Sequence, residues 1–154
     1  QVLDGPNGIA GEWGHNPLPW PRDDERPGRG CFCGHSGCIE TFLSGPGMER
    51  DHSPDRRLTS VQIVAGAQAG ESACRATLDR YAERLARALA HVINIVDPDV
   101  VVLGGGMSNV DALYDAVPRI WADWVFSDRV DTRLARHRHG DSSGVRGAAW
   151  LWPR

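Results

Sequence analysis

The feature that most limits what this chain can fold into is a group of three cysteines within eight residues, preceded by a histidine. The stretch GHNPLPWPRDDERPGRGCFCGHSGCIE (14–40) has the pattern His-x15-Cys-x-Cys-x4-Cys, formed by His15, Cys31, Cys33 and Cys38. Three thiols and one imidazole are a common ligand set for tetrahedral zinc, and four protein ligands leave no open position for water. The pattern therefore predicts a structural Zn²⁺ site.

Other uses of the cysteines fit the spacing less well. Cys31 and Cys33 are too close in the chain to pair comfortably as a disulfide, and Cys74 lies in a helical pattern where a small buried residue is expected. A redox Cys-x-x-Cys motif is absent. His35 could replace His15 as the fourth ligand, although its position beside Cys33 makes simultaneous ligation awkward. The remaining alternative is three surface thiols beside an unrelated histidine.

Length and charge exclude several classes of protein. The chain has 154 residues, 41% of them hydrophobic, which suits one domain or one lobe with a core of its own. A net charge of −3 gives no attraction to nucleic acid or anionic lipid. The longest aliphatic run, VVVL at 100–103, is too short to span a bilayer. We expect a cytoplasmic protein without nucleic-acid or membrane partners.

The beginning of the chain suggests that it is a piece of a longer protein. It starts QVLDGPNGIAG, without an initiator Met and without the basic and apolar regions of a signal peptide. This opening has the character of a strand entering a turn. We therefore expect the chain to have been cut or processed inside a β-hairpin.

Hydrophobic periodicity predicts an α/β fold. The strongest helical pattern covers 71–96, with Arg84 and Arg87 mostly off its apolar stripe, and Pro98 ends it. The run at 100–103 predicts a strand buried on both faces. The other expected elements are a helix over roughly 110–125 capped by Ser108 or Asn109, a strand in TRLARHRHG (132–140), and a closing helix in DSSGVRGAAWLW (141–152) capped by Asp141 or Ser142.

The first half is expected to be less regular. The charged segment 21–30, PRDDERPGRG, is predicted to be exposed. A short helix in CIETFLSG is expected to break near 45–47, and 48–58 is predicted to be irregular. Thr59 and Gln62 form a capping box for the helix that follows.

Four segments together resemble the bacterial repressor–ORF–kinase (ROK) sugar kinases, and among them the fructokinases or mannokinases most. They are GIAGEWGHNPLPW, CFCGHSGCIE, VINIVDPDVVVLGGGMSN and HGDSSGVRGAAWLW. The resemblance implies a two-lobed fold of the actin/hexokinase/Hsp70, ribonuclease H-like type, with sugar and ATP between the lobes. It implies that this chain is most of the second lobe, with an inserted zinc-binding loop at 12–40. The family's first phosphate loop and its catalytic aspartate have no counterpart here.

The resemblance also implies roles for individual residues. The family's zinc ligands correspond to His15, Cys31, Cys33 and Cys38, and its sugar contacts to Glu12, His15 and Glu40. Carboxylates accept strong hydrogen bonds from sugar hydroxyls, and His15 could bind metal with one ring nitrogen and sugar with the other. Without the resemblance, Glu12 and Glu40 would be interpreted as solvated surface charges.

A glycine turn after the buried strand is assigned to ATP in the same way. Gly104, Gly105 and Gly106 lack a Cβ, so a nucleotide can approach their backbone closely. The turn lacks the third glycine of the dinucleotide fingerprint, and taken alone it would be interpreted as a tight strand-to-helix connection. The resemblance places the adenosine and α-phosphate of ATP beside it.

The expected function is ATP-dependent, Mg²⁺-assisted phosphorylation of a hexose, with fructose converted to fructose 6-phosphate. Alternatives are an N-acetylhexosamine or glucose kinase of the same family, a sugar-responsive ROK repressor, and a zinc-stabilised fold without a ligand. The resemblance further implies a homodimer. Because the catalytic aspartate is missing, the isolated chain is expected to have no kinase activity.

Overall fold

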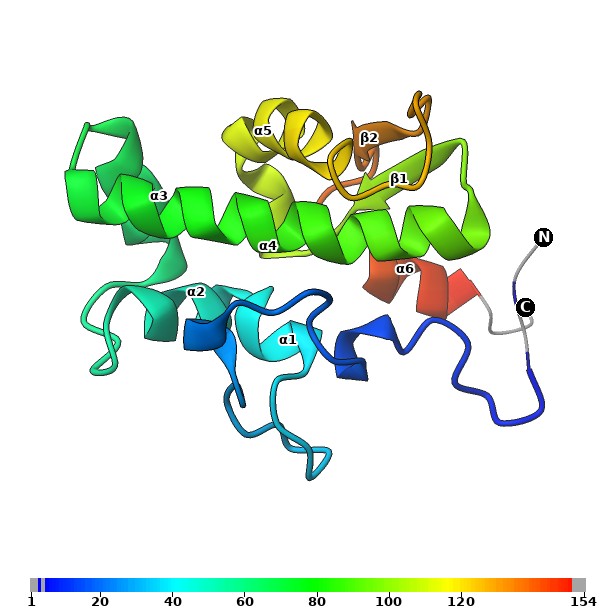
Figure 1. Ribbon diagram of the computed structural model, residues 1–154, viewed down its shortest axis with the longest axis horizontal. Helices are drawn as coiled ribbons and strands as arrows, with labels where there is room; N and C mark the ends of the chain where they lie inside the picture. The colour runs from blue at the N-terminus through cyan, green and yellow to red at the C-terminus, as the bar shows by residue number, and fades with distance from the viewer. Residues whose placement is uncertain (1–2, 4, 151–154) are drawn as a thin grey trace.

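The computed structural model describes residue 3 and residues 5–150, with helix α4 (Ser72–Val96) running through the middle of the molecule (Figure 1). Helix α5 (Asp111–Trp121) and the strands lie on one side of α4 in this view, and helices α1 (Ile39–Phe42) and α2 (Gly45–His52) lie on the other. The remaining elements are η1 (Trp13–His15), η2 (Asp23–Glu25), α3 (Ser60–Gln68), β1 (Val100–Leu103), η3 (Gly106–Asn109), β2 (Arg133–Arg136) and α6 (Ser143–Trp150). Within the described residues, no helix combines the length and apolar character that crossing a bilayer requires.

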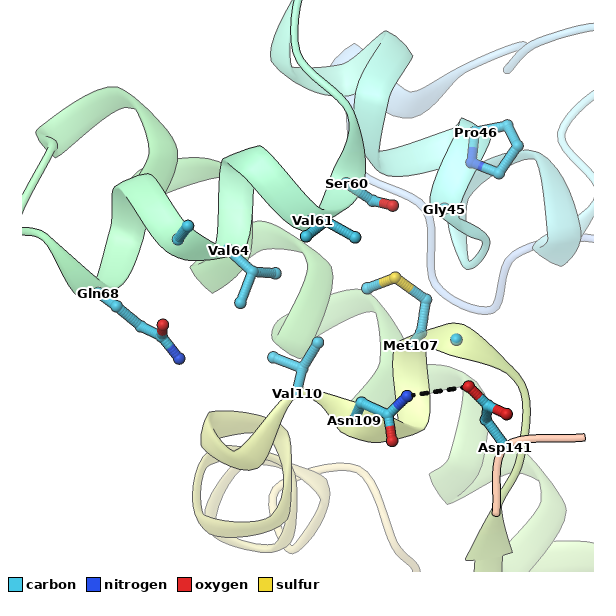
Figure 2. A pocket seen from close by; sticks show the side chains of 12 residues that line it. Gly45, Pro46, Ser60, Val61, Val64, Gln68, Met107, Asn109, Val110 and Asp141 are labelled. Atoms are coloured by element: carbon cyan, nitrogen blue, oxygen red, sulfur yellow. Dashed lines mark hydrogen bonds between the residues drawn. The ribbon is translucent and has the colours of Figure 1, made fainter.

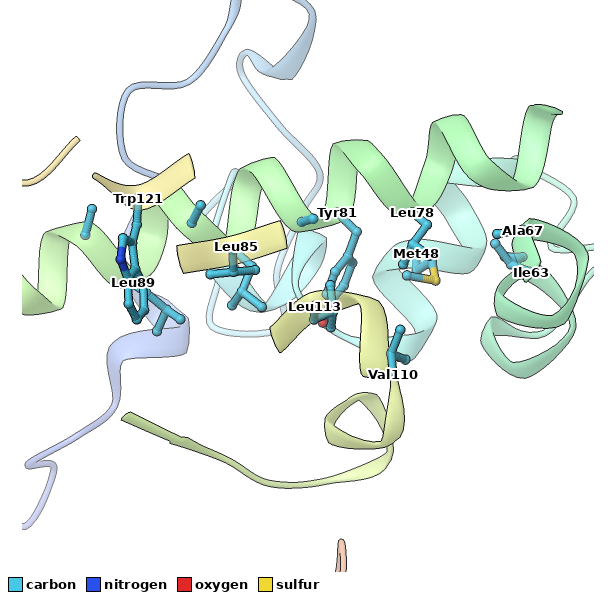
Figure 3. Packing of buried hydrophobic residues seen from close by; sticks show 14 of the residues in the cluster. Met48, Ile63, Ala67, Leu78, Tyr81, Leu85, Leu89, Val110, Leu113 and Trp121 are labelled. Carbon is cyan, nitrogen blue, oxygen red and sulfur yellow. The ribbon is translucent and has the colours of Figure 1, made fainter. Parts of the chain in front are cut away.

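The apolar stripe of α4 forms the centre of the main core, as its helical spacing predicts. Its side chains pack against residues of α2, α3 and α5 (Figure 3). The buried members from α4 include Leu78, Tyr81, Ala82, Leu85, Leu89 and Ile93. Each buried leucine or isoleucine contributes about 1.5–3 kcal/mol through removal of its side chain from water. The helix ends at Val96, where Asp97 takes a left-handed conformation and Pro98 follows, so the predicted end is confirmed.

The sheet has two parallel strands among the described residues, β1 and β2, paired from Val100↔Arg133 to Leu103↔Arg136. The prediction that 100–103 is buried on both faces is wrong for this structure. Val101 and Leu103 pack against the main core, whereas Val100 and Val102 are 39% and 56% exposed. One face of strand β1 therefore packs against the core, and its other face is exposed to solvent.

Helix α2 corrects the expectation of a break at 45–47 and an irregular segment after it. Ser44 is the N-cap of α2, and its Oγ accepts a hydrogen bond of 3.0 Å from the backbone N–H of Gly47. Pro46 lies in the first turn of the helix, where a missing N–H costs nothing. The Gly-Pro-Gly sequence therefore begins a helix here. The Thr59–Gln62 capping box at the start of α3 is confirmed.

Both ends of helix α5 also differ from the prediction. The helix begins at Asp111 after Val110, without a side-chain cap, and ends at Trp121 instead of near 125. Ser108 Oγ donates to the carbonyl of Gly105 at 2.6 Å, so it stabilises the preceding turn and leaves the helix uncapped.

Most of segment 21–30 is exposed, as predicted, and Glu25 is the exception because it meets charged side chains of α4. Glu25, Arg84 and Arg87 are all buried, and the two arginines form ion pairs with the carboxylate. A buried charge is tolerated when it is paired and hydrogen-bonded. Arg84 forms a further ion pair with Asp51, and Arg87 forms one with Glu83.

The close contact between α3 and α4 at Gly66 gives a first prediction. A Cβ at this position would lie 2.7 Å from Cys74 Sγ and 2.9 Å from Glu71 Oε2. Gly66→Ala should therefore lower the free energy of unfolding by about 1–3 kcal/mol, measured by urea denaturation. Gly147→Ala in α6 is the control, because a Cβ there meets nothing within 4 Å and should leave stability unchanged or slightly raised. Equal stabilities of the two variants would contradict the packing account.

Candidate functional site

Short antiparallel pairings bring the predicted metal ligands together. The segment after His15 pairs with the segment around Cys38, through Leu18 N–H to Gly37 O at 3.0 Å and Ile39 N–H to Asn16 O at 2.9 Å. A second pairing folds the cysteine loop on itself. It includes Cys31 N–H to His35 O at 2.7 Å and Gly37 N–H to Arg29 O at 2.9 Å.

The four predicted ligands form one cluster. The donor atoms of His15, Cys31, Cys33 and Cys38 all lie within 4.8 Å of one another. Cys31 Sγ is 3.5 Å from His15 Nδ1, and Cys33 Sγ is 3.6 Å from Cys38 Sγ. Zinc–sulfur bonds of about 2.3 Å in a tetrahedron give ligand–ligand distances of roughly 3.8 Å, so this donor set fits zinc in both chemistry and spacing.

The other histidine and the other cysteine lie outside this cluster. His35 Nδ1 is 3.5 Å from Cys33 Sγ, but the four-membered group contains His15 in its place. Cys74 is buried on α4, as predicted, and all four cysteines are free of disulfides.

The thiols of the cluster differ in acidity. Hydrogen bonds to the backbone and ring of His35 lower the pKa of Cys33 to about 6. A backbone hydrogen bond at Cys33 lowers the pKa of Cys31, but burial and the Glu40 carboxyl outweigh it and raise that pKa to about 12. Burial likewise raises the pKa of Cys38. Metal binding at this cluster would therefore release protons from Cys31 and Cys38, because a thiol binds zinc as the thiolate.

The predicted sugar contacts lie beside this cluster. Glu12 Oε2 is 3.9 Å from His15 Nε2, which leaves Nδ1 of the same ring facing Cys31. Glu40 Oε1 accepts a hydrogen bond of 3.2 Å from Cys31 Sγ. A Cβ at Gly14 would lie 3.5 Å from the Cβ of Glu40, so the Glu12–His15 segment lies against the start of α1. The structure thus brings Glu12, His15 and Glu40 close together.

The predicted nucleotide turn is built on a positive φ. Gly105 has φ 72° and ψ 178°, a conformation that side chains disfavour, and its N–H donates to Asp141 O at 3.0 Å. A Cβ placed at Gly104, Gly105 or Gly106 would meet nothing within 4 Å. The turn therefore has open space over all three glycines.

A cavity of about 710 Å³ opens between α3, the start of α2 and η3 (Figure 2). Val64, Met107 and Val110 supply apolar walls, as Figure 2 shows. Asn109 and Asp141 lie at one end of it, joined by a hydrogen bond of 3.2 Å. An apolar cavity of this size with a few polar groups is typical of small-molecule sites.

Sequence reasoning missed most of this cavity. The sequence predicts Asp141 or Ser142 as the cap of the last helix, and it does not predict that the Asp141 carboxylate accepts hydrogen bonds from Asn109 and Ser142 at this cavity. The α3 wall includes Val61, which is 77% exposed. Apolar residues on the outer face of a helix could have signalled a ligand surface, but the sequence does not reveal which face lies outside.

A second cavity touches both predicted ligand regions. It measures about 620 Å³ and is lined by Trp13, by the three glycines 104–106, and by side chains of α4 and β1. Trp13 lies between Glu12 and His15 in the chain. The nucleotide turn and Trp13 therefore border one space, although Glu12, His15 and Glu40 do not themselves line it.

Comparison with known proteins gives the family of the chain. The model of the ROK family matches residues 1–154. The chain is 40% identical over 155 residues to an N-acetyl-D-glucosamine kinase of Pectobacterium carotovorum, covering 97% of this chain and 51% of the relative. It is 38% identical over 157 residues to an N-acetyl-D-glucosamine kinase of Vibrio cholerae, covering 98% and 52%. The chain thus spans about half the length of the curated relatives it matches.

Solved structures have the same fold. The ROK hexokinase from Thermus thermophilus superposes with a TM-score of 0.80 at 30% identity, over 98% of this chain and 50% of that one. A ROK family glucokinase from Streptomyces griseus, in complex with glucose and AMPPNP, gives a TM-score of 0.84 at 22% identity, over 98% and 54%. The second likeness supports the fold alone. With the family match over its whole length and these relatives, the chain belongs to the ROK family.

Proposed function

We propose that the protein transfers the γ-phosphoryl group of ATP to a hexose, and that this chain supplies part of the binding site for both substrates. The observation that supports this most is the second cavity, which is lined by glycines 104–106 and by Trp13, the residue that follows Glu12 in the chain. A kinase must hold its acceptor and its nucleotide next to each other, because positioning provides most of the catalysis of phosphoryl transfer. Mg²⁺ would accompany the bound ATP and neutralise charge on its phosphates.

We propose that His15, Cys31, Cys33 and Cys38 hold a structural Zn²⁺. The ion would keep the loop in one conformation, and no chemical step is assigned to it. In this proposal His15 uses Nδ1 for the metal, since that atom faces Cys31, and its Nε2 remains available on the side of Glu12.

Glu12 and Glu40 are proposed to accept hydrogen bonds from sugar hydroxyls, with His15 Nε2 as a donor. A charged acceptor makes these bonds about twice as strong as neutral ones. The resemblance of the motifs favours fructose as the acceptor. The names of the two reported relatives favour N-acetyl-D-glucosamine instead, so N-acetyl-D-glucosamine is the first acceptor to test.

The nucleotide is proposed to lie over Gly104, Gly105 and Gly106. The 710 Å³ cavity beside α3, which Gly106 also lines, is the proposed place of the base, with Asn109 and Asp141 at its polar end. Open space over all three glycines is consistent with close approach of a phosphate or ribose.

We also propose that the chain acts as one of two lobes and that the protein is a homodimer. Two aromatic side chains, Phe126 and Trp150, are 98% and 84% exposed in the part of the chain that the structure describes. Such side chains suit an interface, and the dimer stays a prediction that sedimentation can test. Trp152, expected in the core or an interface, lies outside the described residues.

The proposed function predicts phosphorylation that depends on Glu40. The protein that contains this chain should phosphorylate N-acetyl-D-glucosamine or fructose with Mg-ATP, measured by coupled ADP release. Glu40→Gln should lower kcat/KM for the sugar by about 10–100-fold, since the loss of a charge-assisted hydrogen bond costs about 1.5–3 kcal/mol. The KM for ATP should change little.

The controls separate this outcome from general damage. Asp123→Asn removes an exposed carboxylate and should leave all constants unchanged. The isolated chain should show no turnover. Absence of phosphorylation with every hexose and hexosamine tried would refute the kinase proposal, and turnover by residues 1–154 alone would refute the two-lobe proposal.

A further inference from the structure

The spacer between the first two predicted metal ligands contains a buried carboxylate. Glu25 ends the short helix η2 and is 5% exposed, in segment 21–30, whose other residues are prolines, glycines and charged residues that are exposed except for the half-buried Arg29. Its Oε2 accepts a hydrogen bond of 2.8 Å from the backbone N–H of Arg22. The spacer therefore turns one negative charge inward, toward α4.

Two arginines of α4 meet this charge. Arg84 Nε donates to Glu25 Oε1 at 2.7 Å, and Arg87 Nη2 donates to both carboxylate oxygens at 2.8 and 2.9 Å. Arg87 Nη1 also donates to the backbone carbonyls of Pro19 and Trp20, at 3.1 and 2.5 Å. One fully buried guanidinium thus holds the spacer at two points, near its start and near its middle.

The same face of α4 contacts the other end of the ligand set. The Arg84 guanidinium lies over the Phe42 ring, 5.2 Å from its centre, and Phe42 belongs to the helix that begins directly after Cys38. Leu18, Ile39 and Phe42 pack with Ala88 of α4 in a second buried cluster. Leu18 follows His15 by three residues, and Ile39 follows Cys38.

We propose that Glu25 is a positioning residue for the metal centre, held by Arg84 and Arg87. It keeps the 15-residue spacer against α4, so that His15 and the three cysteines are brought together before the metal binds. Fixing this spacer in advance removes part of the ordering entropy that metal binding would otherwise cost. The inference rests on the proposed zinc site.

A purely structural role for Glu25 makes a different prediction. Buried ion pairs are often no more stabilising than apolar replacements, so the cluster alone does not show that it serves stability. If Glu25 served only stability, any variant that weakens the same cluster equally would affect metal binding equally. Asp51 provides the comparison, because Arg84 Nη1 donates to its Oδ1 at 2.8 Å and Asp51 lies in α2, outside the loop.

The test compares zinc affinity in Glu25→Gln and Asp51→Asn. Zinc affinity is measured by competition with a chromogenic chelator, and Co²⁺ absorption reports whether a tetrahedral thiolate site forms. Glu25→Gln should weaken zinc binding by about 10–100-fold, as loss of a residue supporting a ligand typically does. Asp51→Asn should change it by less than about threefold. Unfolding free energies of both variants are measured alongside.

The possible outcomes distinguish failure of the positioning role from failure of the zinc proposal. A wild-type chain that binds neither Zn²⁺ nor Co²⁺ overturns the zinc site and this inference with it. Wild-type binding with unchanged affinity in Glu25→Gln overturns the positioning role alone, as does an equal loss in Asp51→Asn. Should Glu25→Gln fail to fold, Arg84→Lys replaces it, since lysine keeps the charge and lacks the forked geometry. It too should weaken zinc binding by more than Asp51→Asn does, and an equal or smaller loss overturns the positioning role.

Discussion

Replacing Arg87 with methionine should lower the free energy of unfolding by about 3–5 kcal/mol, as removal of one partner of a buried ion pair typically does. The substitution removes the bidentate contact to Glu25 and leaves the Pro19 and Trp20 carbonyls without their donor. Methionine keeps much of the side-chain volume and the helix propensity, so the loss reports mainly on charge and hydrogen bonding. Urea denaturation at neutral pH measures it.

Arg80→Met is the matched control on the same helix. The Arg80 side chain is 40% exposed and pairs with Asp51 at 2.8 Å, a contact that solvent and salt screen. Its loss should cost at most about 1 kcal/mol. If Arg87→Met were no more destabilising than Arg80→Met, the buried cluster would contribute no more than a surface pair.

The effect of Arg87→Met should depend on pH. Burial raises the pKa of Glu25, but hydrogen bonds from Arg84, the Arg22 backbone and Arg87 outweigh it and hold the pKa below its ordinary value of 4.5. A carboxyl with a lowered pKa in the folded state contributes stability above its unfolded pKa, and this is lost as pH falls through the folded value. The difference between wild type and Arg87→Met should therefore be largest near neutral pH and shrink below pH 4.5.

Sequence alone located the Cys/His cluster and α4 because both signals are local or periodic. The spacing of His15, Cys31, Cys33 and Cys38 predicts a ligand set directly. In the structure, the four donor atoms lie within 4.8 Å of one another. The apolar stripe of 71–96 repeats often enough to identify one long helix, which the structure has at Ser72–Val96. Such patterns need no knowledge of which distant residues meet.

The incorrect predictions concern features that are neither local nor periodic. Each depends on contacts with distant residues or on competing local interactions. Glu25 is buried against Arg84 and Arg87, 59 and 62 residues later in the chain, and a charged Pro/Gly segment gives no hint of those partners. The Gly45-Pro46-Gly47 sequence predicts the end of a helix. Because Ser44 caps the segment that follows it, the same residues begin helix α2 instead. The prediction that 100–103 is buried on both faces assumes packed elements on each side of the strand. Among the described residues, only one face of the strand is covered in this way.

Zinc at a free concentration of about a thousand times its Kd should raise the free energy of unfolding by about 4 kcal/mol, compared with the metal-free chain in the presence of a chelator. For a domain of this size that corresponds to a rise in Tm of roughly 8–16 °C. The physical reason is linkage: the cluster exists only in the folded chain, so metal that binds it stabilises folding by its binding free energy. Calorimetry with zinc and with EDTA measures the difference.

Two cysteine variants make this test specific to the cluster. Cys38→Ser replaces a donor that lies 3.6 Å from Cys33 Sγ, and it should abolish most of the zinc-dependent rise because a neutral hydroxyl is a poor zinc ligand. Cys74→Ala removes the buried cysteine on α4 outside the cluster. It should lower Tm with and without metal alike, and leave the zinc-dependent rise intact. Equal melting temperatures of the wild type with zinc and with EDTA would instead mean that the four donors meet without binding metal.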